Sequence, residues 1–201
     1  MHTSIIVAIT GASGALYGIE LIRQLLHHGR AVTLLLSDSG WEVLNHELKL
    51  NWPAGTDRLL AAARNYFKVG EQLRHAGVSD FFAPEASGSA LGGGMVICPC
   101  SMGTLGRIAS GVSGNLIERS ADVALKERRP LILVPRETPL NAIHLENMLK
   151  LNRAGADILP AMPAFYHHPK TLDDLSRHLV GRILDRLQIA HSLTPRWGEE
   201  S

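Results

Sequence analysis

Short apolar segments alternate with amphipathic segments along most of the chain. Ile5–Thr10 is a largely apolar run with several β-branched residues, which is typical of a buried strand. Apolar residues then recur at helical spacing over residues 16–26, and Gly29 marks the end of the predicted helix. Ala31–Leu36 repeats the strand pattern, and residues 41–50 repeat the helical one after a polar turn. This part of the chain therefore predicts two consecutive strand–helix units.

The same alternation returns in the second half of the chain. Thr138 has the position of a helix N-cap before Pro139, and Thr171 opens the last helix with a capping-box-like pattern that includes Asp174. The predicted strands cover residues 95–98, 131–134 and 157–159, and the predicted helices cover residues 101–108, 116–125, 139–154 and 171–187.

Residues 51–94 do not follow the alternation. Prolines, glycines and the run Ser87-Gly88-Ser89-Ala90-Leu91-Gly92-Gly93-Gly94 interrupt the segment. It is interpreted as a long loop, and a loop of this length inside a compact domain is usually functional or interfacial.

The alternation of strands and helices predicts an α/β fold. We expect one domain over residues 1–201, with a Rossmann-like (flavodoxin-like) parallel sheet flanked by helices. Right-handed crossovers would place all the strand-to-helix turns at one edge of the sheet. Open α/β sheets bind their ligands at that edge.

Composition narrows the function classes. The chain has 201 residues, of which 45% are hydrophobic and 19% charged, and its net charge is +1. So small a charge gives no global attraction to nucleic acid or to an anionic membrane. No apolar run approaches the roughly 20 residues that cross a bilayer, and no basic signal-peptide prelude precedes the first strand. We expect a cytoplasmic protein without a membrane span.

The two cysteines do not suggest a metal site. Cys98 and Cys100 are separated only by Pro99, a spacing poorly suited to a disulfide bond. We expect reduced, partly buried turn residues. The sequence also lacks a zinc pattern of histidines and an Asp-rich magnesium repeat, so no metal is predicted.

Three of the turns at the predicted ligand edge have similar compositions. They are Gly11-Ala12-Ser13-Gly14, Ser37-Asp38-Ser39 and Ser101-Met102-Gly103-Thr104. Small hydroxyl residues and glycines at helix starts offer hydroxyls and backbone N–H groups to a phosphate. The first turn has the spacing G-x-x-G-x-x-x-G rather than G-x-G-x-x-G, and Asp38 alone is weak evidence for a nicotinamide site. The set predicts a nucleotide, although a glycine turn is often only a turn.

The turn after the predicted strand at 131–134 carries two adjacent charges. Arg136 has the fork geometry that binds phosphate, and Glu137 has a carboxylate that can move a proton. A capping turn with two solvated charges is the alternative. Arg119, Lys126 and Arg182 with Tyr166 offer further phosphate contacts, although each of them alone is more typical of a solvated or packed residue.

Several motifs run in order along nearly the whole chain. They are Gly11-Ala12-Ser13-Gly14-Ala15 with Tyr17-Gly18, Ser87-Gly88-Ser89, Cys98-Pro99-Cys100-Ser101 with Thr104, Ala121-Asp122-Val123 through Lys126 to Pro130, Arg136-Glu137-Thr138-Pro139-Leu140 and Pro163-Ala164-Phe165-Tyr166-His167. Together they resemble the motifs of the UbiX-type flavin prenyltransferases. The related flavin-dependent cysteine decarboxylases carry a Pro-Ala-Ser-Ala-Asn-Thr type motif where this chain has Pro99 to Thr104. That departure argues against cysteine decarboxylation.

The resemblance implies an activity and a set of roles. The family joins a dimethylallyl group from dimethylallyl monophosphate to N5 and C6 of reduced FMN without a metal, and the prenylated FMN serves UbiD-type decarboxylases. The implied FMN-binding residues are Gly11, Ala12, Ser13, Ser37, Ser101, Met102, Gly103, Thr104 and Arg136. The implied catalytic residues are Glu137 as proton shuttle, Lys126, Tyr166 and Ser13. The implied substrate-binding residues are Tyr166, Arg182, Lys126, Arg119, Ser87, Gly88, Ser89, Trp197 as an aromatic wall, and Glu47 from a neighbouring subunit.

The resemblance also implies a homo-oligomer, a dodecamer with flavin sites at subunit contacts. Residues 191–201 are expected to contribute to the site or to a subunit contact. Two other functions stay open: an FMN-dependent decarboxylase of aromatic or phenylacrylic acids, and a noncatalytic FMN carrier. The sequence does not choose between a monophosphate and a pyrophosphate substrate.

Overall fold

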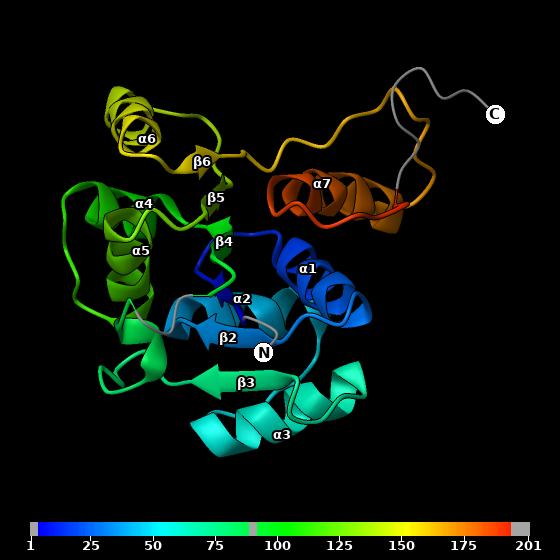
Figure 1. The fold of residues 1–201 in the computed structure, drawn as a ribbon. Coiled ribbons are helices and arrows are strands. Elements are labelled where there is room, and N and C mark those ends of the chain that lie inside the picture. The colour runs from blue at the N-terminus through cyan, green and yellow to red at the C-terminus, as the bar shows by residue number, and fades with distance from the viewer. Residues whose placement is uncertain (1–3, 89–91, 194–201) are drawn as a thin grey trace.

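The computed structural model describes residues 4–88 and 92–193. Within these residues, parallel strands form one sheet of six, in the order β3-β2-β1-β4-β5-β6 (Figure 1). The strands are β1 (Ile5–Ile9), β2 (Val32–Leu36), β3 (Leu73–Ala76), β4 (Met95–Cys100), β5 (Leu131–Pro135) and β6 (Asp157–Ile158). The helices are α1 (Ala15–His27), α2 (Asp38–Leu48), α3 (Thr56–Phe67), α4 (Met102–Ala109), α5 (Leu116–Lys126), α6 (Ala142–Arg153) and α7 (Leu172–Arg186), with a short 3-10 turn η1 (Pro84–Ala86). The predicted parallel α/β fold is confirmed.

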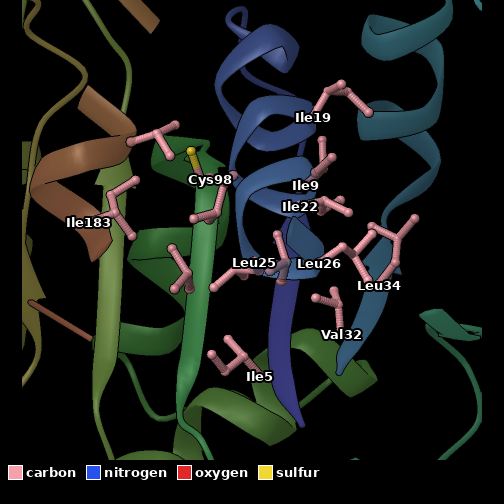
Figure 2. Close-up of a cluster of buried hydrophobic side chains, with 14 of the residues drawn as sticks. Ile5, Ile9, Ile19, Ile22, Leu25, Leu26, Val32, Leu34, Cys98 and Ile183 are labelled. Atoms are coloured by element: carbon pink, nitrogen blue, oxygen red, sulfur yellow. The ribbon is translucent and has the colours of Figure 1, made fainter. Parts of the chain in front are cut away.

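Helices cover both faces of the sheet, because successive strand residues point to opposite sides. Ile5, Val7 and Ile9 of β1 pack with α1 and α7 (Figure 2), whereas Ile6 and Ala8 pack with α4 and α5. Figure 1 shows α4, α5 and α6 on one side of the sheet, with α1 and α7 on the other. The strand order reverses between β1 and β4, so the loops after these two strands separate and leave a crevice at the carboxyl edge.

The interpretation of residues 51–94 as a loop is wrong. The segment contains α3, β3 and η1, and α3 buries Leu59 and Ala63 against the sheet. Its N-cap, Gly55, makes no side-chain cap bond, so the usual sequence signal for a helix start is missing.

Two predicted helix starts are also wrong. Helix α2 begins at Asp38 rather than near residue 41, because Ser37 is its N-cap and accepts a hydrogen bond from the Gly40 amide at 3.0 Å. Helix α6 begins at Ala142 rather than at Pro139. Asn141 is its N-cap and forms a capping box with His144, so the predicted cap Thr138 lies outside the helix.

The last helix begins where its sequence predicts, whereas the cysteines lie elsewhere than expected. The capping box of Thr171 and Asp174 at the start of α7 is confirmed. Cys98 and Cys100 are free, but both are fully buried residues of β4 and not partly buried turn residues. Burial raises the pKa of both thiols, that of Cys100 to about 12, so both stay protonated at neutral pH.

Gly18 allows α1 to lie close to β4. A Cβ atom there would stand 2.4 Å from the Cys98 carbonyl oxygen. We expect Gly18→Ala to lower the free energy of unfolding by about 1–3 kcal/mol, the usual cost of overpacking, measured by thermal or denaturant unfolding. Gly106→Ala in α4 is the control, because its Cβ would meet only the Asn147 side chain at 3.4 Å. Equal stability of the two variants would contradict this account of Gly18.

Candidate active site

A pocket of ≈ 390 Å³ lies at the carboxyl edge, where the strand order reverses. The three hydroxyl-rich turns that the sequence predicted to bind phosphate meet there, and their convergence is confirmed. The lining residues are Gly11, Ser37, Asp38, Ser39, Val78, Ser101, Thr104, Arg107, Asn115 and Ile117.

Helix N-termini give this pocket a positive local potential. Ser37 caps α2, Ser101 caps α4 and Asn115 caps α5, and all three residues line the pocket. Ser101 Oγ accepts from the Thr104 amide at 3.3 Å, and Asn115 Oδ1 accepts from the Glu118 amide at 3.0 Å. Converging helix N-termini lined with hydroxyl side chains favour an anion such as a phosphate.

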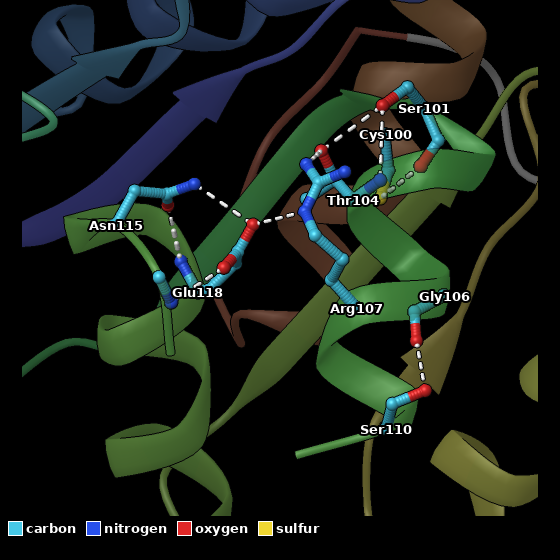
Figure 3. Close-up of polar contacts among 9 residues, drawn as sticks. Cys100, Ser101, Thr104, Gly106, Arg107, Ser110, Asn115 and Glu118 are labelled. Atoms are coloured by element: carbon cyan, nitrogen blue, oxygen red, sulfur yellow. Dashed lines mark hydrogen bonds and ion pairs between the residues drawn. The ribbon is translucent and has the colours of Figure 1, made fainter. Parts of the chain in front are cut away.

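Arg107, which the sequence analysis missed, borders the same pocket. Its Nε donates to Glu118, a carboxylate that is only 1% exposed, and its Nη2 lies 3.4 Å from Thr104 Oγ1 (Figure 3). Glu118 also accepts from the Gly114 amide and from Asn115 Nδ2. The network holds the guanidinium at the pocket wall. Asn115 carried a usable signal, since an Asn three residues before a Glu resembles a capping pattern.

Thr10 joins the ends of the two central strands and is a second residue that the sequence analysis missed. Its hydroxyl donates to the Pro99 carbonyl at 3.0 Å and accepts from the Ser101 amide at 2.8 Å. Gly11 follows, and a Cβ atom there would stand 2.6 Å from Ser39 Cβ. The first turn therefore needs glycine in order to pass close to the second one.

Glu47 caps the first helix of its own chain. Its Oε2 accepts from the amides of Gly14 at 3.0 Å and Ala15 at 2.9 Å. Glu47 and Ser13 border a second pocket, of ≈ 540 Å³. Within one chain, α2 therefore carries Glu47 to the first turn. Its supply to the substrate site of a neighbouring subunit stays a prediction.

Arg136 links the end of β5 to the first turn. Its Nε donates to the Ser13 carbonyl at 3.1 Å, across 123 positions of sequence. Tyr17 lies near both Arg136 and Cys98: burial and Cys98 raise the pKa of its hydroxyl, and Arg136 opposes them. Glu137 is exposed and accepts from the Thr138 amide at 3.1 Å. Both charged residues border a largely apolar pocket of ≈ 370 Å³.

Tyr166 and Arg182 lie on the α7 side of the sheet. The Tyr166 hydroxyl is 3.0 Å from His178 Nε2, and Arg182 forms an exposed ion pair with Asp185 at 3.1 Å. Burial lowers the pKa of the His178 imidazole, and His167 and then Arg182 lower it further, so Arg182 is close to His178. These side chains form one polar group beside α7.

Lys126 and Arg119 belong to a separate group, on the opposite face. Both are on α5, where Arg119 Nε donates to the Ala86 carbonyl at 3.3 Å and Lys126 pairs with Glu127 at 3.2 Å. The Ser87-Gly88 loop lies beside them, since a Cβ at Gly88 would stand 2.6 Å from Glu127. The sheet therefore separates Lys126 from Tyr166 within one chain. Ser89 and Trp197 lie outside the described residues.

Groups of three or more His, Cys, Asp or Glu side chains placed to hold a metal ion do not occur among residues 4–88 and 92–193. Over the same residues, no helix is long and apolar enough to span a bilayer.

Comparison with known proteins identifies the family. The family model described as Flavoprotein matches residues 1–183. The protein named Flavin prenyltransferase UbiX from Alkalihalophilus pseudofirmus is 53% identical over 193 residues, which cover 96% of this chain and 95% of the relative. The chain belongs to the UbiX flavin prenyltransferase family. The resemblance seen in the sequence motifs is thereby confirmed.

Solved structures of UbiX proteins agree with this fold. AnUbiX (PadA1), solved in complex with FMN and dimethylallyl pyrophosphate, superposes with a TM-score of 0.87 at 39% identity, covering 100% of both chains. A dodecameric FMN-dependent UbiX-like decarboxylase from Escherichia coli O157:H7 superposes with a TM-score of 0.82 at 39% identity, covering 96% of this chain and 98% of the other.

Proposed function

We propose that this protein is a flavin prenyltransferase, which joins the dimethylallyl group of dimethylallyl monophosphate to N5 and C6 of reduced FMN. The observation that carries the proposal is the meeting of three hydroxyl-rich helix starts at the reversal of strand order, beside Arg136 and Glu137, in a chain of the UbiX family. Two UbiX relatives are described with FMN, one of them with a dimethylallyl substrate.

The pocket residues suit FMN. The helix N-termini at Ser37 and Ser101 and the guanidinium of Arg107 favour its phosphate, and Gly11 brings the first turn close to Ser39 at the same pocket. We assign flavin binding to the residues that the family resemblance implies: Gly11, Ala12, Ser13, Ser37, Ser101, Met102, Gly103, Thr104 and Arg136.

Reduced FMN supplies the nucleophilic ring positions, and the residues of the chain stabilise the leaving phosphate and move protons. When the carbon–oxygen bond of the prenyl phosphate breaks, negative charge grows on the leaving oxygens. Lys126, Arg119, Arg182, Tyr166 and Ser13 stabilise that charge with preorganised donors, which act in place of a metal. Glu137 moves protons released during ring closure toward the departing phosphate.

A complete site needs more than one copy of the chain. Lys126 and Arg119 lie on the opposite face of the sheet from Tyr166 and Arg182, so a single chain cannot direct all four at one phosphate. The dodecameric E. coli relative supports the proposal that this protein is also a homo-oligomer, a dodecamer in which a neighbouring subunit supplies Lys126 and Arg119.

Mixed oligomers test this arrangement. Lys126→Ala and Glu137→Gln are each expected to be nearly inactive as pure oligomers. Oligomers assembled from equal amounts of the two should regain roughly a quarter of the sites, because chance then places an intact Glu137 beside an intact Lys126 from a neighbour. Steady-state assays and native mass spectrometry of the mixture measure both quantities. Hybrid oligomers without regained activity would contradict the shared site.

The reaction is expected to survive chelation. The proposed phosphate ligands are cations and hydroxyls, so exhaustive treatment with EDTA should leave the rate of product formation unchanged. The control is EDTA-treated protein to which Mg²⁺ has been returned. A rate that depends strictly on added Mg²⁺ would refute metal-independent phosphate departure.

Release of inorganic phosphate separates this proposal from its two alternatives. We expect release from dimethylallyl monophosphate only when reduced FMN is present, and no carbon dioxide from phenylacrylic acid with FMN. Release of carbon dioxide would favour an aromatic acid decarboxylase. The E. coli relative is described as a decarboxylase, without a named substrate. Tight FMN binding with neither product would favour a noncatalytic FMN carrier. Parallel assays with the pyrophosphate decide which prenyl substrate is preferred.

One further assignment rests on the family. We propose that the product passes to a UbiD-type decarboxylase, which consumes prenylated FMN as its cofactor. The cytoplasmic location predicted from the sequence stays a prediction.

A further inference from the structure

The hydroxyl of Tyr166 meets a buried histidine that none of the assigned roles uses. His178, on α7, is 8% exposed, and its Nε2 lies 3.0 Å from the Tyr166 oxygen. The His178 ring also stacks on His167, with centroids 4.9 Å apart and planes inclined by 9°. Tyr166 itself is 50% exposed. A buried imidazole therefore holds the hydroxyl of a half-exposed tyrosine.

The surroundings of the two ring nitrogens of His178 show which residue donates in this hydrogen bond. Within the described part of the chain, Nδ1 of His178 is buried and has no hydrogen-bond partner. A neutral imidazole carries one hydrogen, on Nδ1 or on Nε2. A hydrogen on Nδ1 would be a buried donor without an acceptor, which is rarer and costlier than an unused lone pair. Placed on Nε2, the hydrogen points at the Tyr166 oxygen.

The surroundings keep His178 neutral. Burial lowers its pKa most, and the nearby charges of His167 and Arg182 lower it further. The Tyr166 hydroxyl is in contact with Nε2 of His178. The neighbouring Arg177 is directed at another residue, since its Nε lies 4.0 Å from Glu20 Oε1 on α1. With His178 donating, the Tyr166 oxygen accepts, and the hydrogen of the tyrosine hydroxyl does not point at His178.

A phosphate dianion has only acceptor oxygens, so Tyr166 contributes to its binding only as a donor. We propose that His178 is a positioning residue: its Nε2–H donates to the Tyr166 hydroxyl and directs that hydroxyl's hydrogen at the phosphate of the prenyl substrate. This inference rests on the proposed function, and it deepens the account of the phosphate site.

Gln and Met make a matched pair of substitutions at this position. Both are unbranched, of similar length and good helix formers, but only Gln keeps an N–H donor near the place of Nε2. We expect His178→Met to lower kcat/KM for dimethylallyl monophosphate by about three- to tenfold, the usual value of one hydrogen bond. The inhibition constant of inorganic phosphate should rise by a similar factor. His178→Gln should stay within about twofold of the wild type in both measurements.

The His178→Met substitution is also made in a Tyr166→Phe variant, which lacks the tyrosine hydroxyl. If His178 acts through the tyrosine hydroxyl, His178→Met should cause no further loss once that hydroxyl is gone. FMN affinity, measured by fluorescence titration, should be the same in all variants, which shows that they fold. Should His178→Met fail to fold, His178→Phe, which preserves the stacking on His167, takes its place with the same expected result.

Three results would overturn the inference: equal behaviour of the Gln and Met variants, an unchanged phosphate inhibition constant in the Met variant, or the same loss from His178→Met with and without Tyr166. The proposed function fails separately, if the wild-type protein forms no prenylated flavin. Phosphate inhibition is then measured through protection of FMN-loaded protein against thermal unfolding, which tests the phosphate contact without turnover.

Discussion

Glu137→Gln is expected to slow prenyl transfer by about 10²- to 10⁴-fold and to leave FMN affinity unchanged. Gln keeps the shape of the side chain and an oxygen that can accept from the Thr138 amide, the contact that Glu137 now makes at 3.1 Å. Only the proton-carrying carboxylate is lost. Single-turnover rates with reduced FMN measure the chemical step, and fluorescence titration measures binding.

Glu146→Gln is the matched control, because Glu146 is an exposed glutamate on α6 close by in sequence. It should turn over at the wild-type rate. If Glu137→Gln also did so, Glu137 would be a solvated turn residue, and another group would have to carry the protons.

Arg136→Ala is expected mainly to weaken the binding of FMN. The guanidinium holds the Ser13 carbonyl at 3.1 Å and adds positive charge beside the flavin pocket, so its loss frees the first turn and removes a charge. We expect FMN to bind about 10- to 100-fold more weakly, as for the loss of a hydrogen bond with a charged partner, with a reduced rate as well. Fluorescence titration gives the affinity.

Arg136→Lys should fall between Ala and wild type, since Lys keeps the charge and loses the fork geometry. Arg153→Ala, at the exposed end of α6, is the control and should bind FMN normally. Wild-type FMN affinity in Arg136→Ala would show that the contact with Ser13 is only a surface hydrogen bond.

Much of the fold could be predicted because it depends on periodicity. Buried parallel strands such as Val32–Leu36 are continuous apolar runs, and α7 has both an apolar face and a capping box. The start of α6 could not be predicted, because Thr138-Pro139 and Asn141 both satisfy the local rules for a helix start, and packing decides between them. Helix α3 could not be predicted, because its N-cap Gly55 has no side chain that could form a cap hydrogen bond.

The candidate site, like the fold, could be predicted from the sequence only in part. Turns at strand ends must share one edge of a parallel sheet, so the meeting of Ser37 with Ser101 followed from the sequence. Which face a helix covers does not follow from its own pattern, and the separation of Lys126 from Tyr166 became visible only in three dimensions. His178 gave no signal, since an isolated histidine on an apolar helix face looks like any core residue.

The mass of the flavin after turnover tests the central claim most directly. Purified protein is incubated without oxygen with reduced FMN and dimethylallyl monophosphate, and the released flavin is analysed by mass spectrometry. The account predicts a flavin heavier by one five-carbon prenyl unit, formed only when protein, reduced FMN and prenyl phosphate are all present. Recovery of FMN with unchanged mass from a protein that binds it tightly would contradict the account.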